Sequence, residues 1–395
     1  MDLQALGMEA IHDFDDVRQS PLPQERLKAA RKQASAFRER FMDESPVQFY
    51  QSADMVRVPY PTWYAYSGVY TQSTYKFPYI HILNRIFIIQ YHDFLGELKT
   101  LLFSPSDIEA DRETPFFKRL TDKMPNWSPL ESVVAPIIRD VTGALAEVGL
   151  SPEDVDYISY DHLHTQDVRR WLGTNSIGSK NVGEQDKPAY FPNAKLLIHE
   201  QEWLSTTSLL PVQADWYCPN GIEGIDADKV IKFTGSIQLG EGVALVHTPG
   251  HTEGNHSLVA RVPDGIRVTS ENGVGADAYA PMNSKVNAIR RYAKDTGVEV
   301  ILNGNTLEGS NEQYISMVIE KTIAGPSKNP DFPNCASSSE ATPYWLIPGH
   351  KVSHLIGEAK FGNLQKNSAS QPDSTLTSIN QPSSVKDHSL QKESA

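Results

Sequence analysis

The sequence predicts an α/β protein in which two β-sheets are covered by helices. Early in the chain, three runs rich in Tyr, Ile, Val and Phe are separated by turn residues, which is typical of hairpin-connected strands. Later in the chain, short apolar runs alternate with patterns of helical period. Hairpins followed by alternating strands and helices favour two covered sheets over a simple doubly wound sheet.

Composition divides the 395 residues of the chain into three regions. Residues 1–55 form a helical arm with few apolar positions, which we expect on the surface or against a partner chain. Residues 56–362 hold the aromatic and aliphatic runs and form the main domain. Residues 363–395 are rich in Ser, Gln, Asn and Pro with almost no large apolar side chain, so we expect a disordered tail.

The elements expected in the main domain follow from periodicity and from turn residues. β-rich runs give the early strands, a long helical pattern ends at Gly149, and a Pro-Asp-Gly turn separates two late strands. In chain order the expected elements are strands over 56–70, 79–93 and 97–105, helices over 115–124 and 129–150, strands over 155–160 and 191–203, three strands within 240–274, a helix over 283–297, a strand over 298–305 and a helix over 310–325.

Charge and composition exclude several classes of protein. The net charge is −13, from 49 acidic and 36 basic residues, and such a surface repels nucleic acid. No apolar run approaches the ~20 residues of a membrane span, and the N-terminal segment is acidic where a signal peptide is basic and apolar. Two cysteines, Cys218 and Cys335, are too few for a disulfide framework. These features indicate a cytoplasmic protein with no nucleic-acid or membrane partner.

Two segments carry residues suited to metal chemistry. His162 and His164 are separated by one residue at the end of an expected strand, so both imidazoles can face one point and supply half a zinc site. The alternative is a pair of loop histidines that hydrogen-bond to the backbone. Farther along, the Pro249-Gly250 turn presents His251 at a strand end, and a later strand delivers Glu271 into a turn.

These segments resemble the motifs of a known family. SPEDVDYISYDHLHTQD, FPNAKLLIHEQEW, VHTPGHTEGNHSL and VTSENGV occur in the order found in metallo-β-lactamase-fold hydrolases, and most resemble their lactonase and glyoxalase-II-like branch. The resemblance covers about Pro59–Gly325. It implies an αββα sandwich, to which this chain adds the N-terminal helical arm and the C-terminal tail.

The resemblance also implies a ligand set, which this chain matches in part. His162, His164 and His251 fall on the three histidines of the first metal position, and Glu271 falls on the bridging acid and would complete their shell. The remaining counterparts depart from the family pattern, because Gln166 and Asp167 stand where an Asp and a His are expected. Either Asn305 or His350 would fill the last histidine position, according to how the late strand is aligned.

The implied function is a metal-dependent hydrolase that acts on an ester, lactone or thioester through a metal-bound hydroxide. Zn²⁺ is the expected metal, with one ion favoured over two, and Fe²⁺ is the alternative. Asp167 would be the general base. The other functions to be tested are an iron-dependent oxidoreductase of the same fold and a degenerate, non-catalytic binding protein. The partner is a small-molecule substrate that the sequence does not identify, and the arm would be the contact in a homo-oligomer.

Several neighbours of these motifs have two interpretations. His256 is expected to hydrogen-bond within its loop, and His247 to face away from His251. Arg169 and Arg170 are either a solvated pair or a site for an anionic substrate group. Trp216 and Tyr217 either line a pocket or pack in the core.

Overall fold

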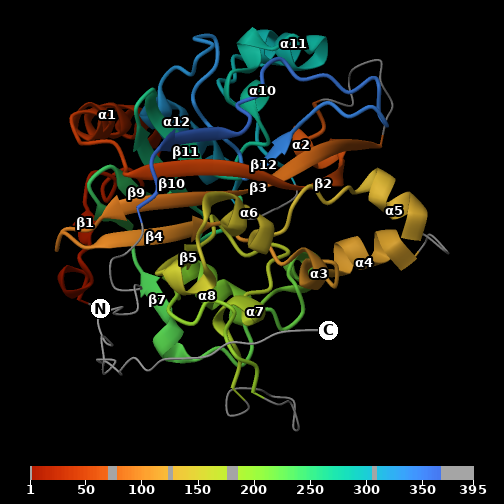
Figure 1. Ribbon diagram of the computed structural model, residues 1–395. Helices are drawn as coiled ribbons and strands as arrows, with labels where there is room; N and C mark the ends of the chain where they lie inside the picture. Colours follow the sequence, from red (N-terminus) through yellow and green to blue (C-terminus); the bar gives the residue numbers. More distant parts are fainter. Residues whose placement is uncertain (1, 70–77, 123–127, 176–185, 305–308, 366–395) are drawn as a thin grey trace, which may run out of the picture. The chain divides into compact units, whose positions relative to one another are not determined.

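Two β-sheets lie face to face, and helices cover both outer faces (Figure 1). The computed structural model describes residues 2–69, 78–122, 128–175, 186–304 and 309–365. These residues belong to one unit that ends at Gln365. The predicted αββα sandwich is confirmed.

The smaller sheet has five antiparallel strands in the order β1-β8-β9-β10-β11. The turn between its last two strands is the predicted Pro-Asp-Gly turn, because Val262 pairs with Gly265. Its strands are β1 (Glu9–Ile11), β8 (Ser236–Gly240), β9 (Val243–His247), β10 (His256–Val262) and β11 (Gly265–Thr269).

The larger sheet runs in the order β13-β2-β3-β4-β5-β6-β7, and β12 pairs with β3. Its first part is antiparallel, whereas the strands from β4 to β7 are parallel, so their carboxyl ends meet at one edge. Its strands are β2 (Phe49–Pro61), β3 (Tyr79–His92), β4 (Leu98–Phe103), β5 (Tyr157–Ser159), β6 (Lys195–His199), β7 (Val230–Phe233), β12 (Ser339–Ala341) and β13 (Ala359–Gly362).

Alternation along the strands produces three apolar layers. In β10, Leu258 and Ala260 pack between the sheets, whereas Val259 packs under the helices of the smaller sheet. In β4, Leu101 packs between the sheets and Leu102 packs on the outer face of the larger sheet. Successive side chains of a strand point to opposite faces, so each strand separates two layers of core.

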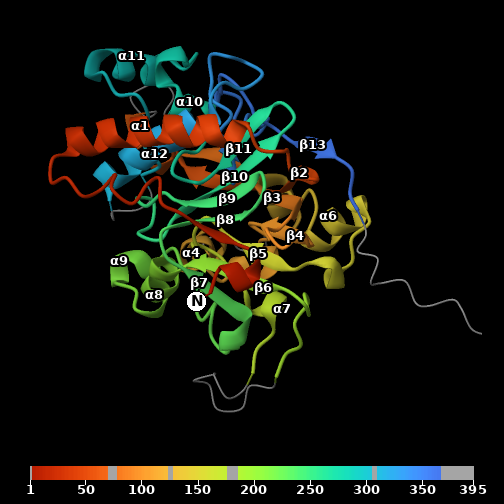
Figure 2. The ribbon, with the colours of Figure 1, turned by 90° about the vertical axis from the view of Figure 1, so that its left-hand side faces the viewer.

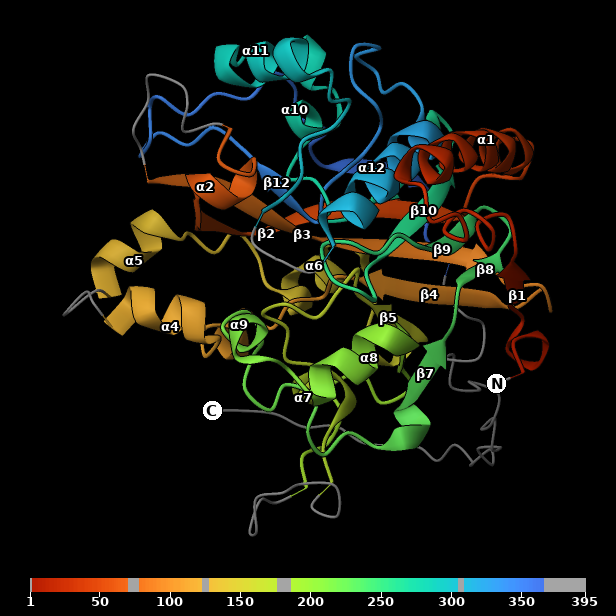
Figure 3. The same ribbon diagram turned by 180° about the vertical axis from the view of Figure 1, so that it is seen from behind.

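The N-terminal arm is part of the packed unit. Its helix α1 (Pro23–Met42) lies along α12 (Ser310–Ala324), as Figures 2 and 3 show from two sides. The apolar face of α1 is buried there and consists of Leu27, Ala30, Ala34, Phe37 and Phe41. Before the helix, β1 pairs with β8 at the edge of the smaller sheet. The few apolar residues of the arm thus share one face, which α12 of the same chain covers, while the opposite face of α1 is exposed.

The remaining helices are short and cover the two sheets or their edges. They are α2 (Thr62–Ala65), α3 (Ile108–Asp111), α4 (Pro115–Asp122), α5 (Ser128–Val134), α6 (Val141–Val148), α7 (Arg169–Leu172), α8 (Glu200–Thr207), α9 (Pro211–Ala214), α10 (Ala276–Tyr279) and α11 (Asn287–Thr296).

Four predicted elements differ from the structure. The strand expected over 56–70 begins earlier, at Phe49, ends at Pro61 and is followed by α2, and the strand expected over 191–203 is limited to β6 and is followed by α8. The single helix expected over 129–150 is two helices, α5 and α6, because Pro136 cannot donate within a helix and Ile137 instead forms a bridge with Val56 of β2. Asp140 then caps α6 through the N–H of Gly143. The strand expected over 298–305 is absent from its described part, residues 298–304, where buried Val300 and Ile301 belong to the core without joining a sheet.

The chain end divides into a described and an undescribed part. Residues 359–362 form β13 on the edge of the larger sheet, and Gln365 is hydrogen-bonded to Gln90. The predicted tail from residue 366 onward lies outside the described residues. Within the described ranges, no helix is long and apolar enough to cross a membrane.

Candidate metal centre

The loop after β5 carries the first two histidines and is folded by local backbone bonds. Thr165 adopts a left-handed conformation, with φ of 63°, and its N–H donates to the carbonyl of Trp216 at 2.7 Å. The N–H of Gln166 turns back to the carbonyl of Leu163 at 3.2 Å. This turn presents His162 and His164 at the edge where the parallel strands end.

The loop between β9 and β10 carries the third histidine. The N–H of Thr248 donates to the carbonyl of Asn255 at 2.9 Å and that of Gly250 to Thr252 at 2.8 Å, which closes the loop on itself. The N–H of His251 donates to Oδ1 of Asn272, at 3.0 Å. Asn272 follows β11, so the loop is fixed from the neighbouring strand as well.

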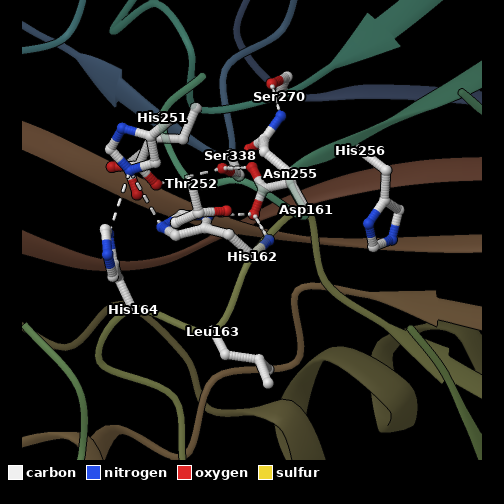
Figure 4. Close-up of polar contacts among 12 residues, drawn as sticks. Asp161, His162, Leu163, His164, His251, Thr252, Asn255, His256, Ser270 and Ser338 are labelled. Carbon is white, nitrogen blue, oxygen red and sulfur yellow. Dashed lines mark hydrogen bonds and ion pairs between the residues drawn. The ribbon is translucent and has the colours of Figure 1, made fainter. Parts of the chain in front are cut away.

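The three imidazoles point toward one another (Figure 4). Nε2 of His251 lies 3.2 Å from Nε2 of His162 and 3.3 Å from Nδ1 of His164. Nitrogens that bind a tetrahedral zinc ion at about 2 Å are separated by about 3.3 Å, so the distances fit a shared cation. All three side chains are buried, with 5%, 4% and 0% exposure for His162, His164 and His251.

Protonation differs among the three histidines. Burial, together with the charge of His162, lowers the pKa of His164 and that of His251 well below the usual value, so both rings are neutral near pH 7. Burial also lowers the pKa of His162, but the charge and hydrogen bond of Asp161 outweigh it and raise this pKa to about 9. Metal binding requires the neutral ring, so a cation at this point displaces the proton of His162.

Asp161 is a site residue that the motif analysis missed. Its Oδ1 lies 2.9 Å from Nδ1 of His162, and its Oδ2 accepts a hydrogen bond from Oγ of Ser338 at 2.7 Å. A carboxylate at Nδ1 fixes the tautomer and leaves Nε2 to face the other histidines. Asp161 directly precedes His162, so its position was visible in the sequence, whereas Ser338 is too distant in the chain to be expected.

Glu271 belongs to a second group of possible ligands that shares only His162 with the three histidines. Among the described residues, it groups instead with Asp161 and His162, and Oγ of Ser338 bridges from Asp161 to Oε2 of Glu271 at 3.3 Å. Burial raises the pKa of Glu271 to about 7, although the charge of His162 opposes the rise. The carboxylate expected to complete the histidine shell therefore lies against Asp161 and Ser338.

Gln166 and Asp167 point in different directions. Gln166 lines the cavity described below, and its Oε1 is buried without a hydrogen-bond partner in the described part of the chain. Asp167 is buried in an ion pair with Arg169, whose Nε lies 2.9 Å from Oδ1 and 3.0 Å from Oδ2. Its carboxylate is thus held by a guanidinium.

Of the two rivals for the last ligand position, the structure describes only His350. Asn305 lies outside the described residues. Burial of His350, together with the charges of His81 and Arg57, lowers its pKa to about 4. His350 belongs to no described group of ligands around the three histidines. In the described part, Asn303 is the amide next to the centre, and its Nδ2 donates to the carbonyl of Glu271 at 3.2 Å.

The neighbouring histidines have structural roles. His256 is buried, with Nδ1 3.3 Å from the carbonyl of Gly254, and Figure 4 shows it apart from the three converging rings. His247 stacks on His199 with ring centroids 3.9 Å apart, so it faces away from His251 as expected.

Arg170 pairs with Asp107 at 3.4 Å and lies over the ring of Trp171. Arg169 and Arg170 are therefore both paired within the chain, and neither is simply solvated.

A cavity of about 360 Å³ opens beside the centre. Its polar end includes Asp161, His162, His164, Gln166, Glu271, Ser338 and Ser339. Its walls are largely aliphatic and aromatic and include Val56, Val58, Tyr60, Ile82, Ile108, Phe117, Leu120, Val134, Ala135, Ile137, Trp216, Leu346 and Ile347. Trp216 thus lines the cavity while stacking on Phe116, and Tyr217 packs edge-on against His164.

Comparisons with known proteins agree with this arrangement. No protein-family model matches the chain. The chain is similar to the N-acyl homoserine lactonase AttM of Rhizobium radiobacter, with 27% identity over 157 residues, which is 36% of this chain and 51% of that protein. It is equally similar to the protein of the same name from Azorhizobium caulinodans, with 27% identity over 156 residues. The chain spans about half the length of the curated relatives it matches.

The similarity to solved structures is weaker in sequence. One is a probable metal-dependent hydrolase from Staphylococcus aureus, with 12% identity, 70% of this chain and 84% of that chain covered, and a TM-score of 0.44. Another is a dizinc quorum-quenching lactonase in complex with a product, with 10% identity, coverage of 82% and 97%, and a TM-score of 0.44. The curated matches and the two-sheet architecture confirm the predicted resemblance to metallo-β-lactamase-fold hydrolases of the lactonase type.

Proposed function

We propose that this protein is a metal-dependent hydrolase that cleaves an ester, lactone or thioester bond in a small substrate with an apolar acyl part. The observation that carries the proposal is the convergence of His162, His164 and His251, with ring nitrogens 3.2 and 3.3 Å apart. Neutral imidazoles are good zinc ligands, and two of these three rings are neutral near pH 7. The similarity to N-acyl homoserine lactonases supports the same reaction class.

We assign one set of residues to binding the cation and another set to binding the substrate. His162, His164 and His251 would hold a divalent cation, which would supply Lewis-acid chemistry when bound. Asp161 orients His162 through Nδ1. The aliphatic walls of the cavity bind the acyl part and exclude water from the reacting bond.

Zn²⁺ is the metal we propose, at one ion per chain. The described residues offer one group of three histidines, whereas the other group of ligands shares His162 and is bridged by Ser338. Asp167, which sequence analysis assigns as general base, keeps that role as a prediction, and its ion pair with Arg169 would have to open first. Fe²⁺ would fit the same histidines and is the alternative in elemental analysis.

The test combines metal analysis with a substrate series. The protein is loaded with Zn²⁺ and assayed with N-acyl homoserine lactones and simple esters of increasing acyl length, for which we expect a KM that falls as the chain lengthens. His251→Ala should abolish both zinc binding and hydrolysis. The control is His12→Ala, since the His12 side chain is 79% exposed. A zinc-loaded protein that hydrolyses none of these substrates would contradict the proposal.

Two expectations about the surroundings of the enzyme stay predictions. One is a cytoplasmic location. The other is a homo-oligomer formed through the arm, whose apolar face already packs on α12, so that only its polar face remains for such a contact.

A further inference from the structure

Glu202 is a buried carboxylate that none of the sequence motifs identifies. It lies in α8, which follows β6, and its exposure is 0%. Its Oε1 accepts a hydrogen bond from the N–H of Leu163 at 2.8 Å, and its Oε2 accepts one from Oγ1 of Thr252 at 2.6 Å. The hydroxyl of Tyr217 donates to Oε1 at 3.4 Å.

The donors of these hydrogen bonds are next to the three histidines. Leu163 is the residue between His162 and His164, and Thr252 directly follows His251. One carboxylate therefore holds the two loops that converge on the candidate metal position, with one oxygen on each loop. The third donor, Tyr217, packs its ring edge-on against His164 with centroids 4.7 Å apart.

The backbone of α8 also lies directly against the second loop. A Cβ atom on Gly254 would lie 2.1 Å from the backbone nitrogen of Glu202 and 2.4 Å from its Cα. Real Cβ atoms do not approach so closely, so only glycine allows the loop and the helix to pack at this distance. The separation between Glu202 and the loop is thus set by backbone packing as well as by its side chain.

Burial of a carboxylate costs free energy, because the ionised group loses its contacts with water. Apolar packing would hold α8 against the two loops at lower cost, but it would not fix the backbone of Leu163 or the hydroxyl of Thr252. Hydrogen bonds to a carboxylate are roughly twice as strong as neutral ones and depend on direction. The geometry therefore serves orientation of the loops more than general stability.

We propose that Glu202 is a positioning residue that sets the spacing between the His162–His164 loop and the His251 loop, and so determines the metal affinity of the centre. The proposal rests on the proposed metal centre. It assigns Glu202 no contact with the metal or with the substrate.

The test compares three substitutions by zinc affinity, measured by competition with a chromogenic chelator. Glu202→Leu removes the hydrogen bonds from Leu163, Thr252 and Tyr217, and we expect zinc affinity to fall about 10- to 100-fold, as for other groups that orient metal ligands. Glu202→Gln should stay within about threefold of wild type, because its amide oxygen accepts from Leu163 and its NH₂ can donate to the Thr252 hydroxyl. Glu200→Gln is the matched control, since Glu200 is exposed on the same helix.

Zinc affinity that is retained in Glu202→Gln distinguishes a positioning role of Glu202 from a role of its negative charge. If Glu202 acted through its negative charge, Gln would be as weak as Leu, and that result would overturn the proposal. Should Glu202→Leu fail to fold, Thr252→Val takes its place, because it removes the hydrogen bond from Thr252 to Glu202 and keeps the shape of the side chain. We expect Thr252→Val to lower zinc affinity about tenfold.

The outcomes also separate this proposal from the proposed function. Wild-type zinc affinity in folded Glu202→Leu and Thr252→Val would overturn the positioning role alone. A wild-type protein that binds zinc, loses affinity on these substitutions and hydrolyses no ester or lactone would support the positioning role and overturn the hydrolase. A wild-type protein that binds no zinc would overturn both.

Discussion

Glu320 is another buried carboxylate, and its burial has a free-energy cost that depends on pH. It lies in α12 with 0% exposure and accepts hydrogen bonds from Nδ2 of Asn272 at 2.6 Å, the hydroxyl of Tyr279 at 2.7 Å and Oγ of Ser257 at 3.0 Å. Burial raises the pKa of Glu320 from 4.5 to about 7, although these hydrogen bonds lower it in part. Asn272 also holds the backbone of His251, so Glu320 supports the metal loop indirectly.

The sign of the effect follows from the direction of this pKa change. The folded protein keeps the proton on Glu320 between pH 4.5 and about 7, whereas the unfolded chain has lost it. The stabilising contribution is therefore full below pH 4.5 and is lost as the pH rises through 7. A rise from 4.5 to about 7 corresponds to about 3 kcal/mol, because one pKa unit is worth about 1.4 kcal/mol.

The assay is denaturant unfolding of wild type and Glu320→Gln at about pH 4.5 and pH 8, followed by tryptophan fluorescence. Glutamine stays neutral and can keep the three hydrogen bonds, so the difference between the two proteins isolates the titration of Glu320. We expect wild type to lose about 3 kcal/mol of unfolding free energy relative to Glu320→Gln over this interval. Glu109→Gln is the control, at a side chain that is 72% exposed. A difference that does not change with pH would refute the reasoning.

Three further predictions concern the metal, the loop packing and the cavity. We expect about one zinc ion per chain, and His251→Ala should abolish zinc binding. His350→Ala should leave the number of bound ions unchanged, because His350 lies beside His81. About two ions per chain in wild type, with fewer in His350→Ala, would show that the imidazole of His350 binds metal. Gly254→Ala should lower the unfolding free energy by about 3 kcal/mol in a denaturant titration, because its Cβ would overlap the backbone of Glu202. Gly309→Ala is the control and should change the unfolding free energy little, because its Cβ would have no neighbour closer than 3.6 Å. Ala135→Trp should raise KM about tenfold for long-chain esters and leave KM unchanged for short ones, because the larger side chain occupies space in the cavity that Ala135 lines. An equal effect on KM for both kinds of ester would show that the acyl part binds elsewhere.

Sequence reasoning located the histidines because their signals are local. One intervening residue between His162 and His164, and a Pro-Gly turn before His251, fix where each ring lies relative to its own strand. The order of strands then brings the two loops to one edge of the sandwich. The resemblance to lactonases supplied the pairing of the loops, which periodicity alone does not contain.

The residues around the histidines were less predictable, because their partners are distant in the chain. Glu202 binds backbone and side-chain groups that are 39 and 50 residues away. Ser338 reaches Asp161 across 177 residues. No periodic pattern marks such contacts. Glu271 was assigned to the histidine shell by its position in a motif, and this role stays a prediction, although its contact with Ser338 was not expected.

Local rules also explain the errors in secondary structure. The helical pattern over 129–150 continues through Pro136 in its apolar spacing, but proline removes the backbone donor that the helix needs. The β-branched residues at 298–301 are buried as a strand would be, yet the described residues of this segment make single backbone bonds, such as that from Ile301 to Ala278, instead of a ladder. Burial thus explains the composition of a segment without fixing its hydrogen-bond partners.

The N-terminal arm contacts, through α12, the loop that carries His251. Nη2 of Arg18 donates to Oγ of Ser316 at 3.0 Å, and that hydroxyl donates at 2.7 Å to the carbonyl of Pro249, two residues before His251. Only one hydroxyl group therefore separates the arm from the loop that carries the third ligand. A chain that lacked α1 and the segment before it would expose the apolar face of α12 and free Ser316 from Arg18 at the same time. If the three histidines bind a metal as proposed, we expect loss of the arm to weaken metal binding through the loop of His251.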